Sequence, residues 1–176
     1  MAFTVEDGTG LAAATAYISE AFADAYFVDR GNATWAAAST GDKETAIVRA
    51  TDYVDKRFGL KFKGVKQSSD QGLEWPRAGA VDNDGYVFED VPRNLEKATA
   101  EYALRALSTS PLVPDNTNAG VNITRKKVGP IETEQELSTP GSGTLVSPSS
   151  IPEYPEADLW ITELLKQSGS RTTVRG

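Results

Sequence analysis

The fold is decided by the stretch Gln71-Gly72-Leu73-Glu74-Trp75-Pro76-Arg77, which lies between two segments with helical periodicity. Residues 46–58 before it and residues 95–106 after it repeat apolar side chains at three- and four-residue steps, as amphipathic helices do. No nucleophile–base pair and no cluster of metal ligands accompanies the stretch in the sequence. We therefore interpret it as a structural clasp between two helices.

Each residue of the clasp has an expected role. Trp75 plugs the helical core, Pro76 fixes the direction in which the chain leaves, and Arg77 pairs with Asp52 or Asp55 on the preceding helix. An alternative remains open, in which Trp75 stacks on a nucleobase while Arg77 meets a phosphate. The core and clasp residues that we expect are Tyr53, Trp75, Pro76, Arg77 and Tyr102.

Composition restricts the chemistry. The chain has 176 residues, enough for one compact core with additional arms, and its net charge is −7. It contains no cysteine and no histidine, which excludes disulfides, thiolate zinc sites and histidine-dependent catalysis. The acidic balance argues against a protein that coats nucleic acid over its whole surface. With no run of eighteen apolar residues and no signal-peptide layout, we expect a soluble cytosolic product without a membrane partner.

Periodicity and breakers divide the chain into elements. Ser19 caps a helix over 19–30, Asp42 caps one that Gly59 ends, and Pro92 opens one that ends near Ser108. A single turn in 32–40 and a short helix from Pro155 complete the helices. Glycine and proline make residues 60–91 an ordered loop with a small hairpin at Asp84-Gly85. Two strands, 121–125 and 131–137, follow the last core helix.

These elements predict a mainly α protein. Residues 1–110 form a small helical bundle core, and residues 111–137 form a protruding β-hairpin. Residues 138–176 form an extended C-terminal arm with a linker, a short helix and a tail. The arm helix carries an apolar face with Trp160, Leu164 and Leu165, which must dock on some surface. In the hairpin, Arg125, Lys126 and Lys127 would face Glu132, Glu134 and Glu136.

We consider the acidic residues both as a calcium site and as a catalytic pair. The acidic cluster at Asp82-Asn83-Asp84-Gly85 invites calcium binding, but a calcium loop needs glycine at its sixth position, where Val87 lies, so a turn is favoured. No pair of carboxylates is singled out for catalysis, and we expect no enzymatic activity and no cofactor.

One basic run resembles a nucleic-acid-binding patch. Its cations are interleaved with Phe58, Leu60 and Phe62, an alternation typical of nucleic-acid-binding patches. The same run would also fit an edge strand kept soluble by lysine, or half of a charge-complementary subunit contact. The cations are Lys56, Arg57, Lys61, Lys63 and Lys66.

An ordered series of motifs resembles a known family over most of residues 3–137. The motifs are Val5–Gly10, Ala16–Ser19, Ala23–Phe27, Arg30–Asn32, Trp35, Ala50–Tyr53, Gln71–Arg77 and Arg125–Pro130. The series resembles the small phage proteins often labelled DnaT-like single-stranded DNA-binding proteins. These proteins in turn look like the head-to-tail adaptor, or head completion, proteins of tailed phages.

The resemblance to adaptors implies a structural virion protein of the neck between capsid and tail, assembled in the host cytoplasm. Its copies would form a closed homo-oligomeric ring, dodecameric to match the portal, through which duplex DNA passes without sequence-specific binding. The arm would dock on the portal protein through Trp160, Leu164, Leu165, Arg171 and Arg175. The hairpin would contact a neighbouring subunit or the next tail or stopper component through Arg125, Lys126, Lys127 and Ile131. The alternative function is single-stranded DNA binding in phage replication.

Overall fold

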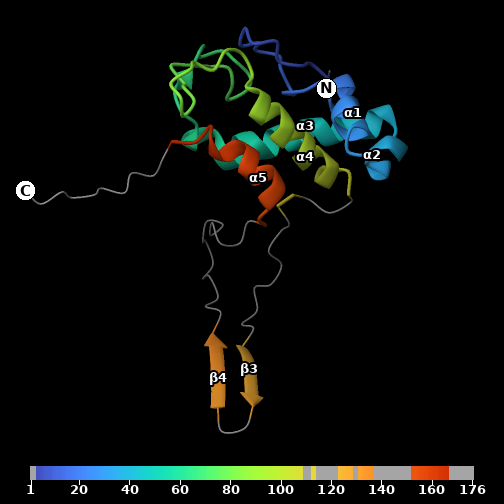
Figure 1. The fold of residues 1–176 in the computed structure, drawn as a ribbon, viewed down its shortest axis with the longest axis vertical. Helices are drawn as coiled ribbons and strands as arrows, with labels where there is room; N and C mark the ends of the chain where they lie inside the picture. The colour runs from blue at the N-terminus through green and yellow to red at the C-terminus, as the bar shows by residue number, and fades with distance from the viewer. Residues whose placement is uncertain (1–2, 109–111, 114–122, 129–130, 137–151, 167–176) are drawn as a thin grey trace, which may run out of the picture. The chain divides into compact units, whose positions relative to one another are not determined.

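The computed structural model describes residues 3–108, 112–113, 123–128, 131–136 and 152–166. These residues fall into two compact units, one made of residues 1–112 with 154–176 and the other of residues 113–153. The helices are α1 (Glu20–Val28), α2 (Ala33–Ala37), α3 (Thr40–Phe58), α4 (Arg93–Ala106) and α5 (Pro155–Thr162) (Figure 1). A 3₁₀ turn, η1 (Gly59–Lys61), and the strands β1 (Val65–Lys66), β2 (Arg77–Ala78), β3 (Ile123–Val128) and β4 (Ile131–Glu136) complete the elements. The prediction of a mainly α fold with a two-stranded hairpin is confirmed.

Side-chain caps set the helix starts. Ser19 accepts a hydrogen bond from the Phe22 amide at 3.1 Å, as the sequence predicts, and Asn32 caps α2 in the same way. The predicted cap of α3 is wrong: Ser39, not Asp42, accepts from the amide three residues ahead. Asp42 lies in the first turn and accepts a hydrogen bond from the Ser39 hydroxyl at 2.7 Å. Both residues therefore stabilise the start of α3.

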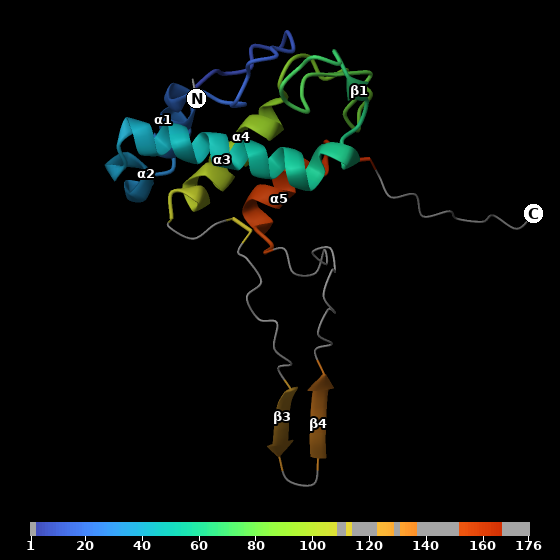
Figure 2. The same cartoon turned by 180° about the vertical axis from the view of Figure 1, so that it is seen from behind.

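The core lies where α3, α4 and α5 pack together, as Figures 1 and 2 both show. The side chains at helical spacing on each helix are fully buried there, in agreement with the periodicity that predicts α3 and α4. They include Ile47, Ala50 and Val54 of α3, Leu95, Ala98, Tyr102 and Ala106 of α4, and Ala157 and Ile161 of α5. Tyr53, Tyr102 and Tyr154 form an aromatic cluster with ring centroids 4.9 to 6.0 Å apart.

Helix α5 belongs to the helical unit and covers the chain's own core. Leu164, expected to meet a partner, is fully buried, and Leu165 is half-buried. Trp160 is half-buried with the Lys97 ammonium 4.3 Å from its ring centroid. The apolar face of α5 therefore has an intramolecular cover. Arg171 and Arg175 lie outside the described residues.

The hairpin of β3 and β4 is antiparallel. Its register places Arg125 opposite Glu134 and Lys127 opposite Glu132, as charge complementarity predicts, while Lys126 lies opposite Thr133. Ile131 opens β4 and pairs with Val128. In the ranges that the structure describes, no helix is both long enough and apolar enough to cross a membrane.

Candidate nucleic-acid interface

Trp75 lies inside the core and is not exposed at all. Its indole packs edge to face between Phe62 and Phe88, with ring centroids 5.7 and 5.9 Å away. The peptide bond between Trp75 and Pro76 is cis, and Pro76 is buried as well. Burial excludes the alternative in which Trp75 stacks on a nucleobase, and it places the residue in the clasp.

Arg77 holds the backbone just before β1. Its guanidinium donates to the carbonyls of Lys63 at 2.8 Å and Gly64 at 3.1 Å, and to the Glu74 carboxylate at 3.0 Å. The predicted partners, Asp52 and Asp55, are wrong, because the pairing of β2 with β1 directs the side chain across the two-stranded sheet. With its side chain only 8% exposed, Arg77 is not available to a phosphate.

Asp55 anchors the same clasp from α3. It accepts hydrogen bonds from the Tyr17 hydroxyl and, at 3.1 Å, from the Glu74 amide. Burial raises the pKa of Asp55 to about 6 against the lowering effect of these two hydrogen bonds, and the charge of Glu74 adds to the rise. The carboxyl group thus ionises near neutral pH at the centre of the clasp.

This pKa predicts that the contribution of Asp55 to stability falls as pH rises from about 4 to about 7. The folded pKa of Asp55 lies above the unfolded value near 3.8, so the folded state binds the extra proton in that window. Relative to neutral pH, Asp55 should add about 1.4 kcal/mol to the free energy of unfolding at about pH 5. Urea unfolding at about pH 5 and pH 7.5 measures the difference, which Asp55→Asn should reduce by that amount. If the free energy of unfolding of Asp55→Asn depended on pH as that of the unchanged protein does, the raised pKa of Asp55 would be contradicted.

The basic run after Asp55 separates into buried and exposed residues. Phe58 and Phe62 are buried, Leu60 is 96% exposed, and Val65 is 66% exposed. Arg57 is drawn inward, where it donates to Asp158 at 3.0 Å, and Lys56 pairs with Asp52 on α3 at 3.5 Å. After the end of α3, Lys61 and Lys66 are exposed and Lys63 is half-buried; Lys56 is exposed as well, but it is paired on α3.

The chain segment that follows α5 lies beside this run. Lys63 donates its amide to the Leu164 carbonyl at 2.9 Å, and Lys166 donates its amide to the Lys61 carbonyl at 2.8 Å. An antiparallel bridge joins Phe62 to Leu165 between them. We call the resulting surface, made of Lys61, Lys63, Lys66 and Lys166, the basic edge. Lys166 was not among the residues singled out in the sequence. The signal that could have indicated it is the absence of acidic residues after Glu163.

The ammonium groups of the basic edge have few strong partners. Within the described residues, no side-chain partner is found for Lys61, and Lys166 reaches only the Leu60 carbonyl at 3.5 Å. Lys63 donates to the Val81 carbonyl at 3.0 Å, and Lys66 pairs with Glu74 at 3.2 Å. Because a carbonyl leaves the positive charge of a lysine uncompensated, three of the four lysines keep their charge for a ligand.

The glycine-rich loop near the N-terminus is already filled by a carboxylate. Glu6 is 5% exposed and accepts from the amides of Gly8, Gly10 and Leu11 at 3.0, 2.8 and 3.0 Å. Gly8 and Gly10 have positive φ, which turns these amides toward the Glu6 side chain. Because these amides already bind an internal anion, they do not form a phosphate cradle.

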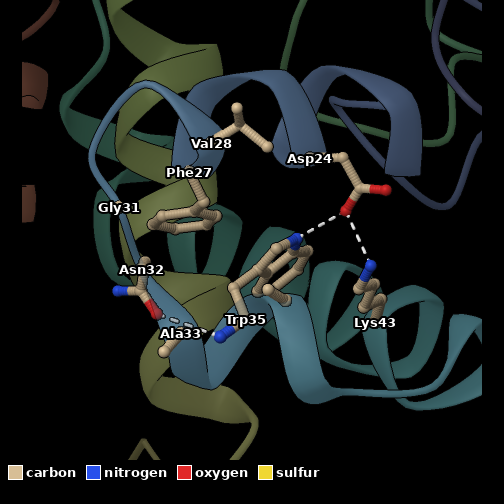
Figure 3. A pocket seen from close by; sticks show the side chains of 9 residues that line it. Asp24, Phe27, Val28, Gly31, Asn32, Ala33, Trp35 and Lys43 are labelled. Carbon is tan, nitrogen blue, oxygen red and sulfur yellow. Dashed lines mark hydrogen bonds and ion pairs between the residues drawn. The ribbon is translucent and has the colours of Figure 1, made fainter.

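A shallow pocket of about 480 Å³ lies between α1 and α2. Figure 3 shows that its polar groups contact one another: Asp24 accepts from the Trp35 indole at 2.7 Å and from Lys43 at 2.8 Å. Asn32 accepts from the Trp35 amide at 2.9 Å, and the remaining lining is mainly apolar. The two charged side chains of the pocket, Asp24 and Lys43, are therefore already paired with each other.

The acidic cluster at Asp82–Gly85 forms a turn that its own backbone amides hold. Asp82 accepts hydrogen bonds from the amides of Asp84 at 2.9 Å and Tyr86 at 2.8 Å, and Val81 bridges to Val87, as the sequence predicts for a turn. In the part of the chain that the structure describes, no group of three or more histidine, cysteine, aspartate or glutamate side chains could hold a metal ion.

Fold and surface together define a small, mainly helical protein of acidic composition with a local basic edge. The chain belongs to the family described as "Putative DnaT-like ssDNA binding protein", whose model matches residues 1–176. Searches of curated proteins and of solved structures found no match.

The family match corrects the assignment to a virion head-to-tail connector. Membership in the DnaT-like family is confirmed over the whole chain, but the description of that family is of single-stranded DNA binding and names no connector. The comparisons show neither a portal partner nor a ring. The structure gives a physical reason for the error, because the face of α5 that was expected to dock on a portal packs on α4 of the same chain.

Proposed function

We propose that this protein binds single-stranded DNA through the basic edge and performs no catalysis. The observation that carries the proposal is the pairing of two acid-free segments that are far apart in the sequence. Residues 56–69 and residues 164–176 contain basic residues and no aspartate or glutamate, in a chain of net charge −7. Their backbones hydrogen bond to each other at Lys61, Lys63 and Lys166. The description of the family supports the same function.

The size and chemistry of the edge favour a single strand. A flexible strand can follow a short row of lysines, whereas a rigid duplex would also approach the acidic remainder of the surface. Leu60 and Val65, both exposed beside the lysines, offer apolar contact to unstacked bases. With so few cations available, binding should be weak and its salt slope modest, so affinity should be measured first at low ionic strength.

Neutralising Lys61 and Lys63 together (Lys61→Gln with Lys63→Gln) should weaken binding and flatten its salt dependence. For single strands, each lost phosphate contact reduces the slope of log K against log salt by about 0.7, so the double variant should lose up to about 1.4. Fluorescence anisotropy with a labelled oligothymidylate, titrated between about 50 and 200 mM salt, measures both quantities.

Arg30→Gln with Arg49→Gln provides a control with the same change in net charge. Arg30 stacks on Tyr26 of α1, and Arg49 donates to the Ala106 carbonyl at 2.8 Å, so neither belongs to the basic edge. The control variant should show the same slope of log K against log salt as the unchanged protein. If the two double variants bind alike, the charge effect is non-specific and the edge is not the site. If the unchanged protein does not bind the oligonucleotide at low salt, the proposed function is wrong.

A further inference from the structure

The turn from Val81 to Phe88 displays an aromatic side chain beside the basic edge. Tyr86 is 74% exposed. Across the described ranges, every other tryptophan, phenylalanine or tyrosine side chain is buried or half-buried. An exposed tyrosine presents a flat surface on which a nucleobase can stack whatever its identity.

The backbone that carries Tyr86 is held on both sides. The Asp82 amide donates to the Tyr86 carbonyl, and the Tyr86 amide donates to the Asp82 carboxylate, both at 2.8 Å. Beyond the turn, the Phe88 amide donates to the Ala80 carbonyl at 2.9 Å. Since the turn is already ordered, stacking on Tyr86 requires little further loss of conformational entropy.

Two independent connections fix the turn relative to the basic edge. The Lys63 ammonium donates to the Val81 carbonyl at 3.0 Å, one residue before Asp82 pairs with Tyr86. Below the surface, the Trp75 indole packs between Phe62 of the edge and Phe88 of the turn. The buried tryptophan is thus a positioning residue that holds the lysines and the exposed tyrosine in one arrangement.

We propose that Tyr86 is the base-stacking residue of the single-strand site, while Lys61 and Lys63 hold the adjacent phosphates. This inference rests on the single-stranded DNA binding proposed above. Asp82 and Asp84 flank the tyrosine in the turn, so their charge disfavours a phosphate there and favours the base over the ring. Phosphates on the lysine side and bases on the turn side give the bound strand a fixed orientation.

The test compares Tyr86→Ser with Tyr86→Phe, each against a normal oligothymidylate and against an abasic strand of equal length. Loss of one stacked base should lower the affinity of Tyr86→Ser for the normal strand about five- to 150-fold, while Tyr86→Phe should retain most of it. The salt slope of Tyr86→Ser should stay unchanged because no phosphate contact is lost. Tyr86→Ser and the unchanged protein should bind the abasic strand equally.

Val28→Ser is the matched control, since Val28 on α1 is also an apolar residue that is 74% exposed. It should bind as the unchanged protein does. If Tyr86→Ser binds the normal strand as tightly as the unchanged protein, or loses the same factor on the abasic strand, the stacking role is overturned while single-strand binding stands. If the unchanged protein binds neither strand, both the stacking role and the proposed function are overturned.

Discussion

Trp75→Ala is expected to lower the free energy of unfolding by about 3–5 kcal/mol. The indole is fully buried, and its removal opens a cavity between Phe62 and Phe88, whose rings contact it from two sides. Those neighbours are held by backbone pairing to Leu165 and Ala80, so they have little freedom to fill the space. Since small domains are stable by only about 5–15 kcal/mol, this variant should be close to unfolding.

Trp75→Phe keeps an aromatic ring in the core, whereas Trp75→Ala leaves a cavity. Within the described residues, the Trp75 indole nitrogen is buried without a hydrogen-bond partner, and a phenylalanine removes this unsatisfied donor. The phenylalanine variant should therefore be clearly more stable than the alanine variant. Urea unfolding followed by far-ultraviolet circular dichroism measures both. Losses below about 1 kcal/mol for Trp75→Ala would show that the residue does not hold the clasp.

The helical part of the fold was predictable because its signals are local. Apolar residues at three- and four-residue steps predict α3 and α4, while Ser19 and Gly59 mark the start of one helix and the end of another. The cap at Ser39 was missed because Asp42 is also a good capping residue three positions later. Local patterns thus fixed the elements with small errors at their ends.

The partners of the clasp were not predictable, because they depend on contacts between distant segments. Arg77 was expected to meet an aspartate on α3, but β1 and β2 bring it to backbone carbonyls. Asp55 instead receives the Tyr17 hydroxyl from 38 positions earlier in the chain. Nothing in the spacing of these residues indicates that they meet.

The same limit applies to the surface. Leu60, Lys61 and Lys63 were part of the predicted basic patch, but Lys166 joins them only through the pairing at Leu164 and Leu165. The sequence of α5 indicates that its apolar face must be covered, but it does not indicate which surface covers it. That ambiguity led to the expectation of a portal partner, whereas the cover is the chain's own α4.

Asp158→Ala should cost about 3–5 kcal/mol, because Asp158 joins α5 to both long helices. Its carboxylate accepts hydrogen bonds from the Tyr102 hydroxyl on α4 and, at 3.0 Å, from the Arg57 guanidinium on α3. The side chains of Arg57 and Asp158 are only 16% and 24% exposed, so water cannot readily replace the lost partner. Removing the carboxylate leaves the half-buried positive charge of Arg57 less well compensated.

Glu156→Ala is the matched control on the same helix. Glu156 pairs with Arg105 at 3.1 Å, but its side chain is 68% exposed, so this surface ion pair should contribute at most about 1 kcal/mol. Urea unfolding of the full chain, without any added partner, compares the two variants. If α5 is an intrinsic part of the core, Asp158→Ala must be the more damaging change by at least about 2 kcal/mol. Equal effects would mean that α5 contributes little to the isolated protein and that its apolar face remains available to a partner.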